Sequence, residues 1–187
     1  MIRESVITTR SADGRTHIAP MGLHEREGGY LVLPFRPSTT LDNLLREGFA
    51  LINFTDDVRV IAGCLTGRRD WPLCPAQRVP GARLAGALTH VELVVERYYD
   101  DPQRPGLFCR PLHWGVHHPF QGFNRAQWAV VEAAILVSRL HILPLERVEN
   151  EMAFLRVALD KTAGDREREA WGWLEEQVDA HRPADVG

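Results

Sequence analysis

The hydrophobic pattern of this chain changes its period near residue 121. Before that point, short β-branched or apolar runs alternate with turn residues, which is typical of strands. The predicted strands cover residues 5–9, 17–23, 29–33, 50–54 and 88–97. Asp13-Gly14 and Gly28-Gly29 supply the residues that tight hairpin turns need. We therefore expect the first three strands to form a meander.

After residue 123, apolar residues recur at three- and four-residue steps, which indicates amphipathic helices. They predict helices over 124–141, 145–159 and 165–181, and a shorter helix over 40–47 ends at Gly48. The predicted fold is thus α+β, mainly β: a β-barrel with a C-terminal appendage of three helices. The expected bounds are 1–121 for the barrel, 122–182 for the helical region and 183–187 for a flexible tail.

The composition narrows the class of protein. With 187 residues, 44% of them hydrophobic and 25% charged, the chain is long enough to bury a sizeable core. A net charge of -3 and the lack of a basic cluster argue against nucleic acid as a partner. The chain has neither the long apolar run of a membrane span nor an apolar leader, so we expect it in the cytoplasm. Its three cysteines form no C-x-x-C pair and are expected to be reduced.

The segment that follows the third predicted strand has the composition of an anion cradle. Arg36, Ser38, Thr39 and Thr40 place a guanidinium and three hydroxyls at the start of a helix. The first amides of a helix lack intrahelical partners and carry the positive end of the macrodipole, so phosphate binds there readily. The alternative is ordinary capping, in which Ser38 or Thr39 caps the helix and Arg36 extends into solvent.

A second constellation consists of Cys109, His113, His117 and His118. The His113-x-x-x-His117 spacing would place two imidazoles on one face of a helix, as in some zinc sites. Prolines and a glycine interrupt any helix in this segment, so we predict no metal site. No nucleophile elbow, Walker loop or dinucleotide fingerprint occurs in the chain either.

Several motifs together carry a resemblance: Glu4–Thr9, Asp13-Gly14, His17–Gly22, Phe35–Thr40 with Asn43 and Asn53, and Gly122–Ala126 with Glu132 and Ser138–Leu140. Their order and spacing resemble the flavin-reductase-like split barrels catalogued as domain of unknown function 447. Members are similar to the FMN-binding split barrels, which dimerise and hold FMN between subunits. The resemblance implies an FMN cofactor, a homodimer, a small-molecule redox substrate and a link to tetrahydromethanopterin-dependent one-carbon metabolism.

The resemblance and the residues point to one FMN site, with the cradle for the phosphate and backbone groups along the ring edge. The predicted cofactor-binding residues are Thr8, Thr9, Ala19, Pro20, Met21, Gly22, Arg36, Ser38, Thr39, Thr40, Asn43, Asn53, Asn124 and Arg125. Ala19–Gly22 suits the ring edge, because Pro20 withdraws a ladder donor and Gly22 lets the backbone approach a ligand closely. The alternative for this segment is an edge-strand bulge.

Other predicted site residues also have two interpretations. Thr8 and Thr9 alternate faces of a strand, so one of them at most points into the cleft. Asn43 either orients a hydroxyl or touches the ribityl chain, or is an exposed helix residue. Asn53 ends an apolar strand, where its amide serves the ligand or the neighbouring backbone.

The residues at the start of the long helix remain open as well. Asn124 is well placed as an N-cap. The positive charge of Arg125 lies in the first helical turn, where the positive end of the macrodipole repels it. An anionic ligand or a carboxylate of a partner subunit would relieve this repulsion.

Two classes of function remain. In the first, the protein is an FMN-dependent oxidoreductase, in which the cofactor does the redox chemistry and the protein orients it. In the second, it binds flavin without turnover, as a carrier or sensor. The residues do not separate the two, and they identify no catalytic side chain; His17 and His24 flank the ring segment, but surface histidines are common on strands.

Overall fold

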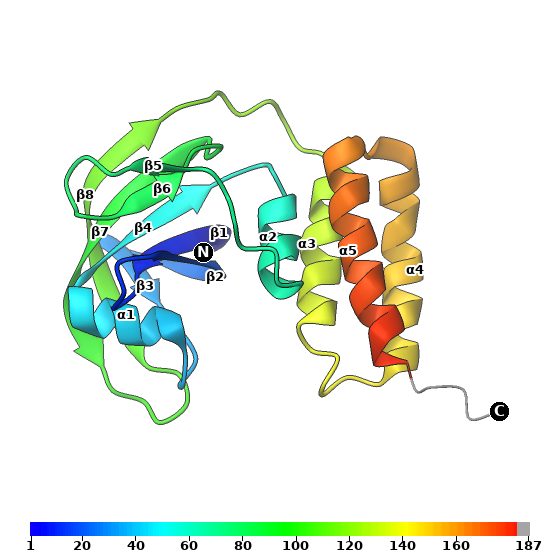
Figure 1. The fold of residues 1–187 in the computed structure, drawn as a ribbon, viewed down its shortest axis with the longest axis horizontal. Helices are drawn as coiled ribbons and strands as arrows, with labels where there is room; N and C mark the ends of the chain where they lie inside the picture. The colour runs from blue at the N-terminus through cyan, green and yellow to red at the C-terminus, as the bar shows by residue number, and fades with distance from the viewer. Residues whose placement is uncertain (183–187) are drawn as a thin grey trace. The chain divides into compact units, whose positions relative to one another are not determined.

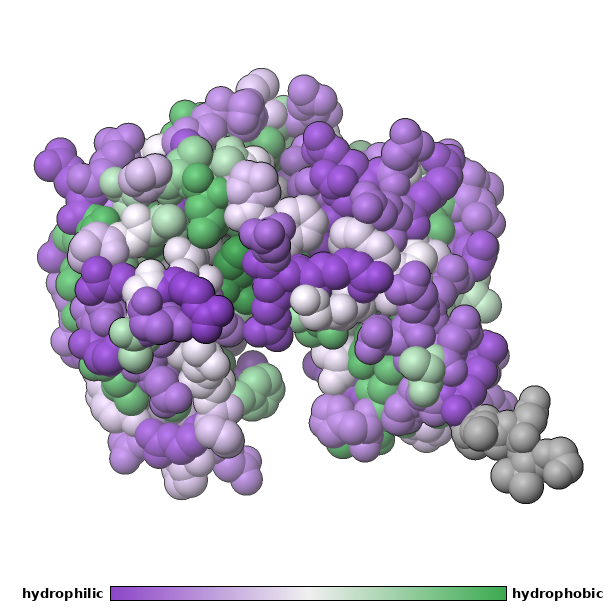
Figure 2. Space-filling view, viewed as in Figure 1, coloured by the Kyte–Doolittle hydropathy of each residue, from purple (hydrophilic) through white to green (hydrophobic). Residues whose placement is uncertain are grey.

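The computed structural model describes residues 1–182, and its contacts divide the chain into two compact units (Figure 1). One unit comprises Met1–Thr55 and Asp70–Phe120, and the other comprises residues 56–69 and the chain from 121 onward. The predicted flexible tail, 183–187, lies outside the described residues. Hydrophilic residues cover most of the visible surface of each unit (Figure 2).

The first unit is a closed antiparallel barrel with the strand order β1-β2-β3-β8-β7-β4, which confirms the mainly β fold predicted from the sequence. Its strands are β1 (Ile2–Arg10), β2 (Thr16–Arg26), β3 (Gly29–Val32), β4 (Phe49–Phe54), β7 (Thr89–Tyr99) and β8 (Gly106–Val116). A separate two-stranded sheet pairs β5 (Leu73–Pro75) with β6 (Ala82–Leu84). The predictions omitted β5, β6 and β8.

The barrel wall is incomplete along part of β2. Because β3 has only four residues, it pairs with residues 23–26 of β2, so that within residues 1–182 the strand ladder of residues 19–22 has β1 as its one neighbour. Side chains that point inward from the strands, such as Ile7, Leu23, Ile52 and Leu93, form the barrel core and are fully buried. The hydrophobic alternation therefore closes the interior, while the short third strand leaves one backbone edge open.

Helix α1 (Thr39–Glu47) connects β3 to β4 and contacts β1 and β2 (Figure 1). Leu41 and Leu44 are buried in the barrel core, which fixes the helix against these strands. Gly48 ends the helix in the left-handed region, with φ 72°, and its N–H donates to Leu44 O at 3.0 Å. The predicted helix and its glycine C-cap are therefore both present.

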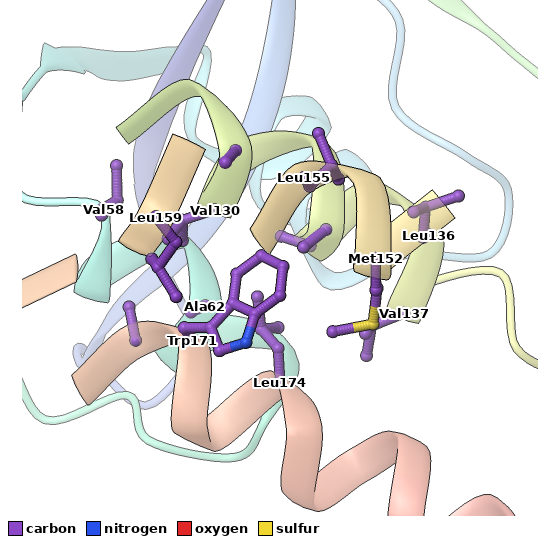
Figure 3. Close-up of a cluster of buried hydrophobic side chains, with 14 of the residues drawn as sticks. Val58, Ala62, Val130, Leu136, Val137, Met152, Leu155, Leu159, Trp171 and Leu174 are labelled. Carbon is purple, nitrogen blue, oxygen red and sulfur yellow. The ribbon is translucent and has the colours of Figure 1, made fainter. Parts of the chain in front are cut away.

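The second unit is helical. It contains α2 (Arg59–Leu65), α3 (Arg125–Val137), α4 (Leu145–Thr162) and α5 (Asp165–His181). Trp171 and Leu174 of α5 pack with Val130 of α3 and Leu155 of α4 (Figure 3). The predicted 124–141 helix ends earlier, at Val137, and α2 was not predicted. Among the described residues, no helix has the length and apolar character needed to cross a membrane.

Candidate functional site

The turn before α1 combines a helix cap with free helical amides. Ser38 is the N-cap: its Oγ accepts from Leu41 N at 3.3 Å, and its carbonyl accepts from Asp42 N at 3.1 Å. The amides of Thr39 and Thr40 precede these bonds and have no intrahelical partner. Capping by Ser38 and anion binding are therefore compatible, because they use different amides of the same turn.

The guanidinium of Arg36, two residues before the N-cap of α1, is held by Tyr98 of β7 and by Asp100, which follows that strand. Its Nη2 lies 2.9 Å from Asp100 Oδ1 and also donates to the hydroxyl of Tyr98, which in turn donates to Asp100 Oδ1 at 2.8 Å. The hydrogen bond from Tyr98, followed by that from Arg36, holds the pKa of the Asp100 carboxyl below its usual range. Arg36 therefore has fixed partners, which the sequence prediction missed because Tyr98 and Asp100 are distant in sequence.

The predicted ring-edge segment, Ala19–Gly22, lies in the part of β2 that has only one neighbouring strand. Its register with β1 is continuous from Ile2↔His24 to Arg10↔Thr16, so this segment contains no bulge. Ser5 Oγ donates to Met21 O at 2.7 Å. The alternative of an edge-strand bulge is therefore wrong, and a role of Ala19–Gly22 along the ring edge stays a prediction.

Thr8 and Asn53 form a buried polar link within the barrel. The Asn53 side chain accepts from Leu84 N at 2.8 Å and donates to Val6 O at 3.0 Å and Thr8 Oγ1 at 3.3 Å. Thr8 Oγ1 donates to Ala82 O at 2.7 Å. Asn53 thus serves the neighbouring backbone, the second of its two interpretations, and joins β1 and β4 to β6.

Asn43 links α1 to the first strand. It is only 2% exposed, so the exposed-residue alternative was wrong. Its Nδ2 donates to Thr9 Oγ1 at 2.9 Å, and its Oδ1 accepts from Arg46 Nη2 at 2.9 Å. Asn43 therefore orients the hydroxyl of Thr9, while its contact with a ribityl chain stays a prediction.

Thr8 and Thr9 also line a pocket of about 220 Å³, together with Arg10 and the segment Pro80–Ala82. Pockets that enclose a drug-sized ligand usually measure ~300–1,000 Å³. This pocket is therefore too small to hold a whole flavin by itself.

A larger pocket of about 540 Å³ lies in the helical unit and contains none of the predicted site residues. Its charged groups already have partners: Arg156 pairs with Glu175, and Arg182 pairs with Glu149 at 2.9 Å. Because these ion pairs satisfy its polar lining, we do not take it as the cofactor site.

Asn124 and Arg125 belong to the helical unit. Asn124 is the N-cap of α3, where its Oδ1 accepts from Ala126 N at 2.8 Å and Gln127 N at 3.3 Å. Arg125 is exposed and has no acidic partner within residues 1–182. Capping thus accounts for Asn124, and a role for either residue toward a ligand stays a prediction.

The cysteine and histidine constellation has a different geometry from the one considered in the sequence. Residues 106–116 form β8, a strand, and Cys109 is buried in the barrel core. The helical spacing of His113 and His117 is therefore absent, and His113 instead lies opposite Glu92 in the β7–β8 ladder.

Comparisons with known proteins agree with this architecture. A family model described as the N-terminal domain of a protein of unknown function (DUF447) matches residues 3–118, and a second DUF447 model matches residues 124–176. An FMN-bound protein of this family from Methanosarcina mazei is similar with a TM-score of 0.80 and 20% identity over 94% of each chain. No curated protein matches the sequence.

More distant structures share the barrel. The 2-nitrobenzoate 2-nitroreductase of Pseudomonas fluorescens has a TM-score of 0.53 at 16% identity, over 61% of this chain and 64% of its own. The flavin reductase component of a bacterial two-component tryptophan halogenase has a TM-score of 0.53 at 18% identity, over 64% of this chain and 82% of its own. These likenesses establish a flavin-reductase-like fold. With family models covering both its barrel and its helices, the chain belongs to the DUF447 family.

Proposed function

We propose that this chain is an FMN-binding flavoprotein. The observation that carries the proposal is the start of α1, where two amides without intrahelical partners lie close in sequence to the anchored guanidinium of Arg36. The FMN bound to the Methanosarcina mazei family member supports the same cofactor here.

The residues present suit a phosphate monoester. The amides of Thr39 and Thr40 and the exposed hydroxyl of Thr39 are donors, and α1 adds the positive end of its macrodipole. Arg36 has five N–H donors, of which Nη2 serves Tyr98 and Asp100, so other donors of the group remain for an anion. These groups would bind the phosphate of FMN, and the open edge of β2 at Ala19–Gly22 would line the ring.

A homodimer completes this site in the proposal. The pocket lined by Thr8 and Thr9 measures about 220 Å³, which leaves most of a flavin to be covered by a second surface. Leu112, Trp114 and Val116 on one face of β8 are 41%, 51% and 77% exposed. A second copy of the chain would bury this apolar row, since exposed apolar patches mark interaction surfaces.

We further propose an oxidoreductase role toward a small molecule, in the cytoplasm. Bound FMN supplies hydride or electron transfer, and the barrel orients it and excludes water. The flavin reductase and nitroreductase folds among the similar structures support this role, and the family resemblance supports a link to tetrahydromethanopterin-dependent one-carbon metabolism. The oxidoreductase role is tested by adding NADH or NADPH to the purified yellow protein without oxygen. If the flavin absorbance bleaches faster than that of free FMN, the protein is an enzyme. A yellow protein inert to both donors is a non-catalytic binder.

The cofactor proposal is tested by calorimetric titration of the apoprotein with FMN. Arg36→Ala is expected to weaken binding roughly ten- to hundredfold, because it removes a charge-assisted phosphate contact. Arg147→Ala removes an exposed, ion-paired arginine of the helical unit and is the matched control. Unchanged affinity in Arg36→Ala would remove Arg36 from the site, and the absence of heat with wild-type protein would refute FMN binding. Sedimentation that finds a stable monomer still holding FMN would contradict the dimer.

A further inference from the structure

A cluster of metal-ligating side chains lies in the barrel wall, apart from the turn proposed for FMN phosphate. It consists of His90 and Glu92 on β7 and His113 on β8, and their ligand atoms all lie within 4.8 Å of one another. His90 and Glu92 are 1% and 0% exposed. His113 is half-buried, so two imidazoles and a carboxylate are gathered at a site that is closed on the side of His90 and Glu92.

His113 has an unsatisfied ring nitrogen at this site. Its Nε2 is buried and has no hydrogen-bond partner among the described residues. Buried polar atoms are nearly always paired, so an orphaned nitrogen near a histidine and a carboxylate needs an explanation. A metal ion is a natural partner, since neutral imidazole is the commonest metal ligand in proteins.

The His90 ring is fixed from two sides. Gly115, its partner in the β7–β8 ladder, leaves room for it: a Cβ at Gly115 would lie 2.3 Å from His90 Cε1. His117 stacks on the ring, and its Nε2 lies 2.8 Å from His90 Nδ1. A hydrogen bond at Nδ1 leaves Nε2 as the ligand atom, which is how a neighbouring group usually orients a metal-binding histidine.

Glu92 is held as a carboxylate facing His90 Nε2. Its Oε1 accepts from Gln77 N at 2.7 Å, and its Oε2 accepts from Arg78 N at 2.7 Å and Val79 N at 2.9 Å. Three backbone donors favour the ionised form, which is the form that binds metal. Its Oε1 lies 3.3 Å from His90 Nε2, close to the ~3.4 Å that separates two ligands of a tetrahedral zinc with bonds of ~2.0–2.1 Å.

We propose that His90 Nε2, Glu92 Oε1 and His113 Nε2 bind one divalent transition-metal ion, with zinc as the best match. Zinc accepts two histidines and one carboxylate and leaves a fourth position for water or another ligand. His90 Nε2 and Glu92 Oε1 already have the required separation, and the ligand atom of His113 lies within 4.8 Å of both. None of the three ligands belongs to the residues predicted to bind FMN. The sequence prediction of no metal considered His113 with His117 on a helix and did not include His90 or Glu92.

The test uses the full-length protein, freed of metal with a chelator and titrated with Zn²⁺ against a chromophoric competitor. We expect one zinc per chain and a higher thermal midpoint with zinc than without it. His113→Ala is expected to weaken zinc binding by about a hundredfold or more. His117 orients His90 without binding the metal, so His117→Ala should weaken zinc binding by about tenfold. His113→Ala costs the metal-free protein no hydrogen bond of the ring Nε2, and its metal-free thermal midpoint is measured beside that of wild type, so that zinc affinities are compared between folded proteins.

His141→Ala is the matched control, because it removes an exposed histidine of the helical unit and should leave zinc affinity unchanged. Co²⁺ provides a second readout, since ligation by these side chains produces visible absorption bands that His113→Ala should lose. The proposal is overturned if wild-type protein retains neither metal, or if His113→Ala binds zinc with the stoichiometry and affinity of wild type.

Discussion

Asn53 offers a direct test of the barrel's internal polar link. It is 0% exposed, and its side chain satisfies Leu84 N and Val6 O while it also donates to Thr8 Oγ1. In Asn53→Ala, Leu84 N and Val6 O lose this hydrogen-bond partner. Each buried group left unsatisfied costs about 1–3 kcal/mol of stability. A small cavity adds to the cost, so we expect destabilisation of about 3–5 kcal/mol. At ~2–4 °C per kcal/mol for a chain of this size, the thermal midpoint should fall by roughly 10 °C.

The assay is calorimetry of the metal- and flavin-free protein, in which the transition of the barrel is followed. Asn150→Ala, at an exposed position of α4, is the control and should stay within about 0.5 kcal/mol of wild type. The reasoning fails if Asn53→Ala is as stable as this control. Loss of FMN affinity in a variant of unchanged stability would show instead that the Asn53 amide serves the ligand.

Two further outcomes follow from packing and burial. Gly29→Ala should lower the free energy of unfolding in urea by about 3 kcal/mol or more, because its Cβ would lie 2.3 Å from the backbone oxygen of Cys109. The control is Gly172→Ala in α5, whose Cβ would meet nothing within 4 Å and which should be neutral or stabilising. Burial raises the pKa of the Cys64 thiol to about 11 and of Cys109 to about 12, so only Cys74 should react quickly with a disulfide reagent at pH 8. Three rapidly reacting thiols in the native protein would contradict this burial.

The sequence by itself determined the elements whose signals are local. Alternating runs and Asp-Gly or Gly-Gly turns predicted the β1–β3 meander. A cap at Ser38 or Thr39 and the stop at Gly48 predicted α1, and the structure shows the cap to be Ser38. The three- and four-residue steps predicted α3, α4 and α5, because helical periodicity is contained within each segment. The composition of the anion cradle was likewise evident from the sequence, since all of its residues lie within residues 36–40.

Only the tertiary structure decided which distant residues meet. The partners of Arg36 lie more than sixty residues away, at Tyr98 and Asp100, and Asn53 was assigned to the backbone by its contact with Leu84. The short α2 has no strong pattern of its own, and its place was set by the apolar core it joins. His113 meets Glu92 through the register of two paired strands, and register is a property of both strands together, which neither segment encodes alone.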